Sequence, residues 1–359
     1  MTTRPSSNLN EFLERLFSEK RLSIFISLGL SLLFYFHFLS IIEPHPSRMT
    51  IGTFMGDAEV LNGTNAWRPR VFAVFLARSF VHLFDASSIP TVVRCIAAWN
   101  TAWLLASFLI FSVWGRYKLL MLVGITLSVL YAYTPASSIY FYPWDYPALF
   151  FYSLSAILFM KSRTTGLVLA VLLGMGFKET ILVTSIFLLG MGSGSLTKRT
   201  LTFLSVLIGC LAIKVTFNTL TGSGFFFVFD TVNFSNQTWI PLSNLRSLFD
   251  PRLNHVIFVN AGTLLISFLL PVRDRQMLIF KAIVVGFFAG NFFLGIIDEY
   301  RIFLEVTPIS LIYILEYWDQ RGRESRRPPH SPPPQRQRRE AGGEDGQNAA
   351  GSEPTPAAN

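Results

Sequence analysis

Apolar runs alternate with short polar turns from residue 22 to residue 317. The first run, 22–42, reaches roughly 30 Å as a helix, because each helical residue adds about 1.5 Å. That length matches the hydrocarbon core of a bilayer. Similar runs predict an all-α fold, a polytopic transmembrane helix bundle of about ten spans. The candidate spans are 22–42, 91–114, 119–135, 139–160, 165–177, 180–192, 201–217, 255–270, 277–297 and 302–317.

The two ends of the chain differ in pattern from the runs between them. Residues 1–21 carry apolar side chains at helical spacing among charged ones, which predicts a cytoplasmic amphipathic segment. The run that follows lacks a small-residue cleavage site, so we expect an uncleaved signal anchor. From Trp318 the composition changes to Pro, Arg, Gly, Glu and Ala, which predicts a disordered cytoplasmic tail over 318–359.

Basic residues gather in alternate short turns, and such turns mark the cytoplasmic side. With both termini cytoplasmic, ten spans place every basic pair on that side. The segments 165–177 and 180–192 are short, and either two broken helices or one long tilted helix fits them. A single helix would put the later basic pairs on the wrong side, which favours ten spans. The pairs are Arg116/Lys118, Lys161/Arg163, Lys198/Arg199 and Arg273/Arg275.

Composition excludes a soluble protein. Only 14% of the residues are charged and 51% are hydrophobic, whereas soluble chains carry about a quarter charged residues. The basic residues that give the net charge of +8 lie beside apolar segments, so we expect membrane lipids and no nucleic acid as partners. Cys95 and Cys210 fall inside apolar runs, and we interpret them as packed thiols rather than a disulfide.

Ionisable groups near span ends are functional candidates, because such groups are costly to keep in a membrane. Four regions place them on the predicted outer face, which suggests one shared site. Simpler readings are solvated acids, a local Lys178–Glu179 ion pair, and an interfacial belt formed by the nearby aromatic residues. The four regions hold Asp57 and Glu59, then Asp145, then Lys178 and Glu179, and finally Asp298, Glu299 and Arg301.

Two predicted outer loops are long, 43–90 and 218–254. The first contains the acidic pair, then Trp67 to Arg70, and then an apolar-faced helical pattern from Val71 to Phe84. Such a helix would lie along the outer surface, and a short re-entrant helix is the alternative. A loop of this length exceeds what a turn requires, so it is a candidate for function.

Asp57-Ala58-Glu59 resembles the acidic pair of the GT-C fold integral-membrane glycosyltransferases, which use polyprenyl-phosphate-linked sugars. Trp67 to Arg70 is similar to the basic stretch that often follows that pair. Segments 176–180 and 298–308 resemble segments of bacterial members, and the resemblance covers residues 22–317. It implies surface-lying helices in the first outer loop. Unlike in larger members, we expect no soluble outer domain after the last predicted span.

The resemblance also implies roles for the candidate residues. Transfer needs a base for the acceptor hydroxyl and cations for the departing phosphate. Asp57 would be the base, with Glu59 as support or alternative base. Some family members bind Mg²⁺ or Mn²⁺ at this pair and others bind none. The phosphate contacts would be Lys178, Arg301, and Arg68 or Arg70, and the sugar-binding or orienting residues Glu179, Glu299, Asp145, Trp144, Tyr142 and Tyr146.

The sequence therefore predicts a membrane glycosyltransferase acting on the extracytoplasmic or lumenal face. Its partners would be a polyprenyl-phosphate sugar donor and a lipid or glycan acceptor. We expect the bacterial inner membrane, with the endoplasmic reticulum as the alternative. A multi-pass transporter or lipid flippase and a non-catalytic scaffold subunit are the competing classes. A transporter should show mid-membrane charges and repeat symmetry, and neither is evident in the sequence.

Overall fold

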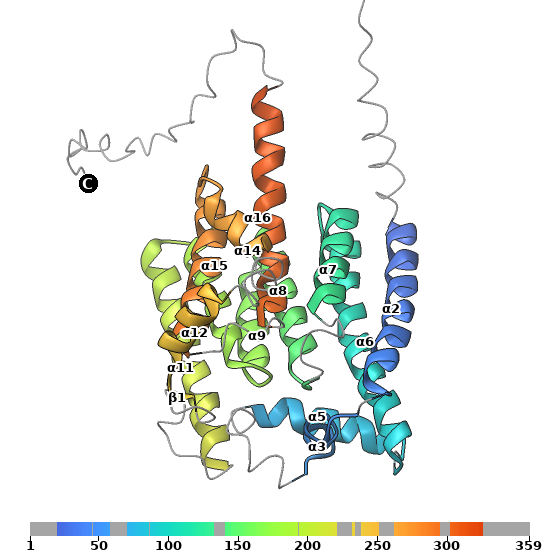
Figure 1. The fold of residues 1–359 in the computed structure, drawn as a ribbon. Helices are drawn as coiled ribbons and strands as arrows, with labels where there is room; N and C mark the ends of the chain where they lie inside the picture. Colours follow the sequence, from blue (N-terminus) through green and yellow to red (C-terminus); the bar gives the residue numbers. More distant parts are fainter. Residues whose placement is uncertain are drawn as a thin grey trace, which may run out of the picture. The chain divides into compact units, whose positions relative to one another are not determined.

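The computed structural model describes residues 20–44, 46–57, 70–85, 87–132, 141–192, 194–220, 232–233, 238–250, 262–294 and 302–325. Residues 1–318 form one compact unit and residues 319–359 a second. The described regular structure is helical (Figure 1), apart from the short antiparallel pair β1 (Val232–Asn233) and β2 (Thr238–Trp239). The helices are α2 (Lys20–Ile42), α3 (Arg48–Met55), α5 (Val71–Leu83), α6 (Ile89–Trp114), α7 (Lys118–Ala132), α8 (Asp145–Met160), α9 (Thr164–Met175), the 3₁₀ helix η2 (Glu179–Ser185), α10 (Ile186–Gly190), α11 (Leu196–Leu220), α12 (Ile240–Phe249), α14 (Gly262–Leu269), α15 (Arg275–Leu294) and α16 (Ile302–Ser325).

Among the described residues, four helices are long and apolar enough to cross a membrane. They lie in α2, α6, α11 and α15, and they confirm the prediction of a helical membrane protein at this level. The other predicted segments contain helices that are shorter or more polar, so the count of ten spans stays a prediction. The predicted amphipathic segment lies outside the described residues, except for its last two positions.

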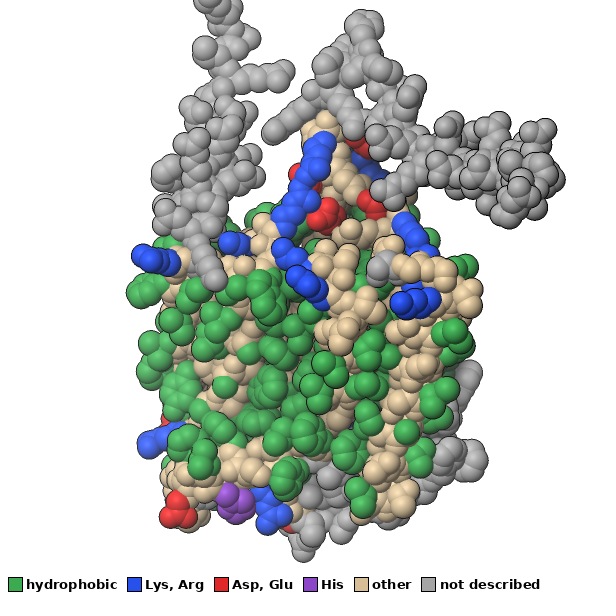
Figure 2. Space-filling view, turned by 180° about the vertical axis from the view of Figure 1, so that it is seen from behind, with side chains coloured by type: hydrophobic (Ala, Val, Ile, Leu, Met, Phe, Trp, Pro, Cys, Tyr) green, Lys and Arg blue, Asp and Glu red, His purple; other side chains and the backbone are tan. Residues whose placement is uncertain are grey.

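The described helices expose a strongly apolar surface. Figure 2 shows a broad band of hydrophobic side chains, with charged side chains beyond its edges. Large side chains on several helices are exposed, including Phe25 (74%), Ile208 (68%) and Leu269 (84%). A soluble monomer rarely exposes an apolar surface of this extent, whereas lipid tails would cover it. The surface therefore agrees with the predicted membrane location.

Helices α2 and α6 pack in opposite directions along a seam of small polar side chains. Ser27 Oγ lies 2.8 Å from Ser112 Oγ, and Ser112 Oγ donates to the Ser23 carbonyl at 3.2 Å. Further along the seam, the rings of Phe34 and Phe108 are 6.3 Å apart. Small hydroxyl-bearing residues let membrane helices approach closely and bond to each other. This seam attaches the first helix to the rest of the bundle.

Helices α8, α9 and the continuous pair η2–α10 reverse direction twice. A Cβ on Gly174 would lie 2.9 Å from Phe151 Cγ and 2.8 Å from Ile181 Cγ2, so glycine permits this close approach. At the other end of α9, Gly166 faces Leu158. Two separate elements thus occupy 164–190, and the reading of 165–192 as one long helix is wrong. The turn between them places Lys178 beside the beginning of α8.

Basic side chains collect where α10 ends. Arg199 Nη1 donates to the Met191 carbonyl at 2.9 Å, and Arg275 Nη2 donates to the Leu189 carbonyl at 2.9 Å. The last carbonyls of a helix lack helical partners and attract cations. One arginine from each of two predicted cytoplasmic basic pairs therefore contacts the end of α10, and the predicted orientation stays a prediction.

The first predicted outer loop contains two helices, α3 and α5. Helix α5 runs across the direction of α2 and α6 (Figure 1). The Thr50 hydroxyl of α3 accepts a hydrogen bond from the Phe141 amide at 3.2 Å, which attaches this loop to the segment before α8. The position of α5 relative to a membrane surface stays a prediction.

Helix α16 is longer than the sequence predicted. It continues to Ser325, past the predicted end of the bundle at 317. The prediction of a disordered tail is therefore wrong for residues 318–325. Arg323 Nη2 donates to Asp319 Oδ2 at 2.8 Å one helical turn away, and no proline occurs between Pro308 and Pro328, so no proline ends the helix in this stretch. The remainder of the predicted tail lies outside the described residues.

Candidate functional site

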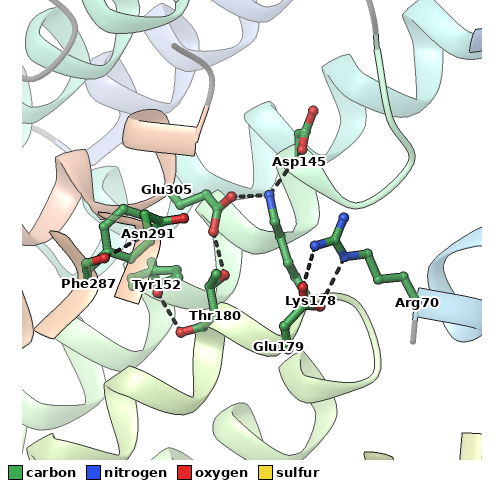
Figure 3. Close-up of polar contacts among 9 residues, drawn as sticks. All are labelled: Arg70, Asp145, Tyr152, Lys178, Glu179, Thr180, Phe287, Asn291 and Glu305. Carbon is green, nitrogen blue, oxygen red and sulfur yellow. Dashed lines mark hydrogen bonds and ion pairs between the residues drawn. The ribbon is translucent and has the colours of Figure 1, made fainter. Parts of the chain in front are cut away.

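Charged side chains from four separate parts of the chain meet at one place (Figure 3). Asp145 is the first residue of α8, and Lys178 precedes η2 in the turn after α9. Glu305 lies in the first turn of α16, and Arg70 is the residue before α5. All four therefore lie at or near the ends of their elements. Together with Glu179, these residues are called the ionic cluster below.

Lys178 forms the centre of the ionic cluster. Its Nζ donates to Asp145 Oδ1 at 3.3 Å and to Glu305 Oε1. The three residues are 4%, 2% and 1% exposed, respectively. Removing such charges from water is costly, and mutual pairing offsets that cost only when the geometry is good. A buried triad of this kind inside an apolar bundle is a functional candidate rather than an ordinary surface ion pair.

Neutral polar groups complete the surroundings of Glu305. The Thr180 hydroxyl donates to Glu305 Oε2 at 2.6 Å, so both carboxylate oxygens of Glu305 have a donor. The Tyr152 hydroxyl donates to the Thr180 carbonyl at 2.7 Å, which fixes the first turn of η2 against α8. The hydroxyl and the lysine together hold Glu305 in one orientation.

A second ion pair lies beside the triad. Arg70 Nε donates to Glu179 Oε2 at 3.0 Å, and Arg70 Nη2 donates to Glu179 Oε1. The Arg70 guanidinium also lies 4.7 Å from the ring centroid of Trp144, which stacks on Tyr142 at 4.8 Å. A two-bond fork of this kind is the strongest geometry for an arginine–carboxylate pair. It connects the first predicted outer loop to the first residue of η2.

Opposite charges balance in this region. Burial disfavours the charged guanidinium of Arg70, but the neighbouring carboxylates of Glu179, Glu305 and Asp145 outweigh that effect and raise its pKa above the usual value. Lys214 of α11, 6% exposed, lies close enough for its charge to act on Glu179 and Arg70. Three carboxylates thus face three cations, and Arg70 stays charged at every physiological pH.

The structure brings together most of the predicted site residues that it describes. Lys178 pairs with Asp145 and Glu305, so the simple local Lys178–Glu179 pair is wrong, and Glu179 pairs with Arg70 instead. Trp144 and Tyr142 lie against Arg70. Trp144 is only 2% exposed, so a sugar ring could reach it only if this stack opened.

Two predicted residues are not among those whose contacts define the ionic cluster. Asp57 follows α3, after Gly56 with its left-handed backbone (φ 72°), and a Cβ on that glycine would touch Arg78 Cδ at 3.0 Å. The contacts that define the ionic cluster do not include Asp57. Tyr146 is fully buried against Phe38, with ring centroids 5.3 Å apart. Outside the described residues lie Glu59, Arg68, Asp298, Glu299 and Arg301.

Sequence reasoning missed Glu305. Its flanking sequence, Ile302-Phe-Leu-Glu305-Val-Thr-Pro308, places one carboxylate inside an apolar predicted span. An acid surrounded by apolar residues in such a span is itself a reason to expect a buried partner. That rule, applied to each span, would have identified Glu305, although not its pairing with Lys178.

The acidic pair Asp57 and Glu59 is the candidate position for a metal ion. Within the described ranges, no group of three or more His, Cys, Asp or Glu side chains is arranged to hold a metal ion. Both carboxylates of the triad accept a hydrogen bond from Lys178, so its one positive charge is shared between them. The predicted pair itself is represented only by Asp57, since Glu59 lies outside the described residues.

Comparison with protein-family models, with curated proteins and with solved structures finds no match to this chain. What the ionic cluster offers chemically is a partly exposed arginine fork beside the stacked rings of Trp144 and Tyr142, and a buried lysine held by two acids. This combination can bind an anion at the arginine and hold neighbouring groups in fixed positions.

Proposed function

We propose that the protein is a membrane glycosyltransferase that moves a sugar from a polyprenyl-phosphate donor to an acceptor hydroxyl on the extracytoplasmic or lumenal face. The observation that carries this proposal is the ionic cluster, which joins the first predicted outer loop to three bundle elements through Arg70, Lys178 and Glu305. A donor with a charged phosphate and a lipid tail suits a charged site at the end of an apolar bundle.

The location of the ionic cluster supports work on one face of the membrane. Asp145 begins α8 and Glu179 begins η2, whereas Arg199 and Arg275 bind the far end of α10. The ionic cluster and these arginines therefore lie at opposite ends of the same elements. By the positive-inside rule the arginine end is cytoplasmic, and the cluster would then face the outside.

In the proposed reaction, the bond between the sugar C1 and the phosphate oxygen breaks while a bond from C1 to the acceptor oxygen forms. The acceptor proton passes to Asp57, and the phosphate leaves with the bonding electrons. Arg70 is the best candidate to neutralise the departing phosphate, since its fork matches two phosphate oxygens. Lys178 and its two acids would hold the turn that carries Glu179. Glu59, Arg68, Glu299 and Arg301 keep their proposed roles as supporting base, cations and orienting acid.

A buried lysine between two acids is also a feature that an ion-coupled transporter could use. Such transporters place their coupling charges near the middle of the membrane, on broken helices. Here Asp145, Glu305 and Lys178 all lie at or near the ends of their elements, which favours an enzyme site facing one side. A scaffold subunit would need none of these carboxylates.

The test is release of sugar from labelled polyprenyl-phosphate sugars by the purified full chain in detergent. We expect turnover by the wild type and near-complete loss in Asp57→Asn. Asp85→Asn is the matched control, because Asp85 is an exposed acid at the end of α5, and asparagine tolerates its positive φ of 46°. Equal thermal melting of all three proteins would exclude misfolding. Full activity of Asp57→Asn would remove the proposed base, and inactivity of the wild type across a broad donor panel would count against the enzyme.

A further inference from the structure

We propose that Glu179 occupies the phosphate position on Arg70, and that a prenyl-phosphate headgroup binds by displacing it. This inference rests on the proposed function, because it concerns the donor site of the same reaction. Arg70 donates through Nε and Nη2 to the two oxygens of Glu179. The same two donors would serve two oxygens of a phosphate, since the guanidinium fork fits both anions. The carboxylate and the phosphate would therefore compete for one position.

The side chains of Arg70 and Glu179 differ in how firmly their surroundings fix them. The Arg70 side chain is 14% exposed and lies over Trp144, which is itself stacked on Tyr142. The Glu179 side chain is 31% exposed, so it has access to solvent on one side. The arginine is thus the fixed partner, and the glutamate is the one that can swing away. Lys214 provides a second positive charge close to the carboxylate position.

The other cation of the ionic cluster does not offer such a position. Lys178 binds Asp145 and Glu305, whose side chains are 2% and 1% exposed. Displacing either acid would leave a buried carboxylate without its cation, which is far more costly than releasing a partly exposed one into water. Among the described cations of the ionic cluster, Arg70 is therefore the one that can exchange its partner.

Exchange and simple orientation predict opposite effects for the same substitution. If Glu179 only orients Arg70, Glu179→Gln disorders the arginine and weakens phosphate binding. If Glu179 occupies the phosphate position, Glu179→Gln removes the competitor and strengthens phosphate binding. Whether Glu179→Gln strengthens or weakens phosphate binding therefore decides between these two roles of Glu179.

The experiment measures binding of farnesyl phosphate to the purified full chain by isothermal titration calorimetry, with farnesol as the probe that lacks the phosphate. For Glu179→Gln we expect the Kd for farnesyl phosphate to fall about fivefold, because a partly exposed pair is a weak competitor. Farnesol binding should not change. Glu316→Gln is the matched control: it makes the same charge change in the Arg116–Glu316 pair, which lies outside the ionic cluster.

A double-mutant cycle separates displacement from a general effect of charge. In an Arg70→Gln background, Glu179→Gln should leave the Kd unchanged, because there is no fork to release. Glu179→Asp, which keeps the charge on a shorter side chain, should give a smaller tightening. Weaker binding by Glu179→Gln, or equal tightening with and without Arg70, would overturn the proposal.

The outcome is independent of sugar transfer. The protein could transfer no sugar while Glu179→Gln still tightens farnesyl phosphate binding only when Arg70 is present. That result would support the displacement of Glu179 and contradict the proposed transferase activity. Transfer in a protein whose Glu179→Gln variant binds farnesyl phosphate more weakly would overturn the displacement alone.

Discussion

Lys178 and Glu305 form a buried ion pair although 127 positions separate them in the chain. The pair joins the turn after α9 to the first turn of α16, and Thr180 adds a second hydrogen bond to the same carboxylate. This connection closes the bundle around the ionic cluster. It also makes the cluster sensitive to the loss of any one charge, because each partner is almost fully removed from water.

Replacing Glu305 by Gln should destabilise the protein by about 1.5–3 kcal/mol, because the hydrogen bonds of Lys178 and Thr180 to this carboxylate lose its charge while Asp145 still pairs with Lys178. The measurement is the thermal melting temperature in detergent, which should fall clearly below that of the wild type. Glu316→Gln, which alters a partly exposed pair, should change melting by little. An unchanged melting temperature for Glu305→Gln would show that the pair does not hold the bundle together.

The losses of stability caused by Lys178→Met and by Glu305→Gln should not be additive. Each single change leaves a buried charge with a missing partner, whereas the double change removes both charges of the pair. We expect the double variant to be more stable than the sum of the two losses predicts, by about 0.5–3 kcal/mol. The same melting assay on all four proteins gives this coupling, and simple additivity would argue against a direct interaction.

Gly174→Ala should destabilise by about 1–3 kcal/mol, because the new methyl group would enter the space of Phe151 and Ile181. Gly290→Ala is the matched control in α15, where nothing lies within 4 Å of the added Cβ. That change should be neutral or stabilising, since alanine favours helix over glycine by up to about 1 kcal/mol. Equal melting of both variants would contradict the close approach of α9 to α8 and η2.

Cysteine labelling tests the orientation of the bundle. Ser162 lies in the exposed turn between α8 and α9, and Ser87 is exposed before α6. With Cys95 and Cys210 replaced by alanine, an impermeant maleimide added to intact cells should label Ser87→Cys and not Ser162→Cys. Permeabilised cells should allow labelling of both. The reverse pattern would invert the predicted topology and place the ionic cluster on the cytoplasmic side.

Much of the helical framework could be predicted from hydropathy alone. The runs at 22–42, 91–114 and 277–297 correspond to α2, α6 and α15, because a long apolar run stays helical whatever its neighbours are. The break near Lys178 was also predictable from Gly174 and Gly176. The beginning of α8 was less predictable. The sequence predicts a span from 139, whereas the helix begins at Asp145, after Pro143 and the stacked pair Tyr142–Trp144.

The candidate site was predictable in part. The predicted topology places four charged residues on the same face and therefore in one region: Asp145, Lys178, Glu179 and Arg70. Their partners did not follow, because neighbours in sequence compete with residues brought near by folding. Lys178 turns away from the adjacent Glu179 towards Asp145 and Glu305, and Glu179 bonds Arg70 across 109 positions.

The sequence by itself determined the class of fold, the apolar helices and the uneven distribution of charge, since these depend on composition and local periodicity. Only the tertiary structure decided which charges pair. A buried ion pair requires its partners within a few ångströms and away from water, and that condition depends on how helices pack, not on their order. Glu305 shows this most clearly: in the sequence it is one of two acids in a predicted span, and in the fold it holds Lys178 in place.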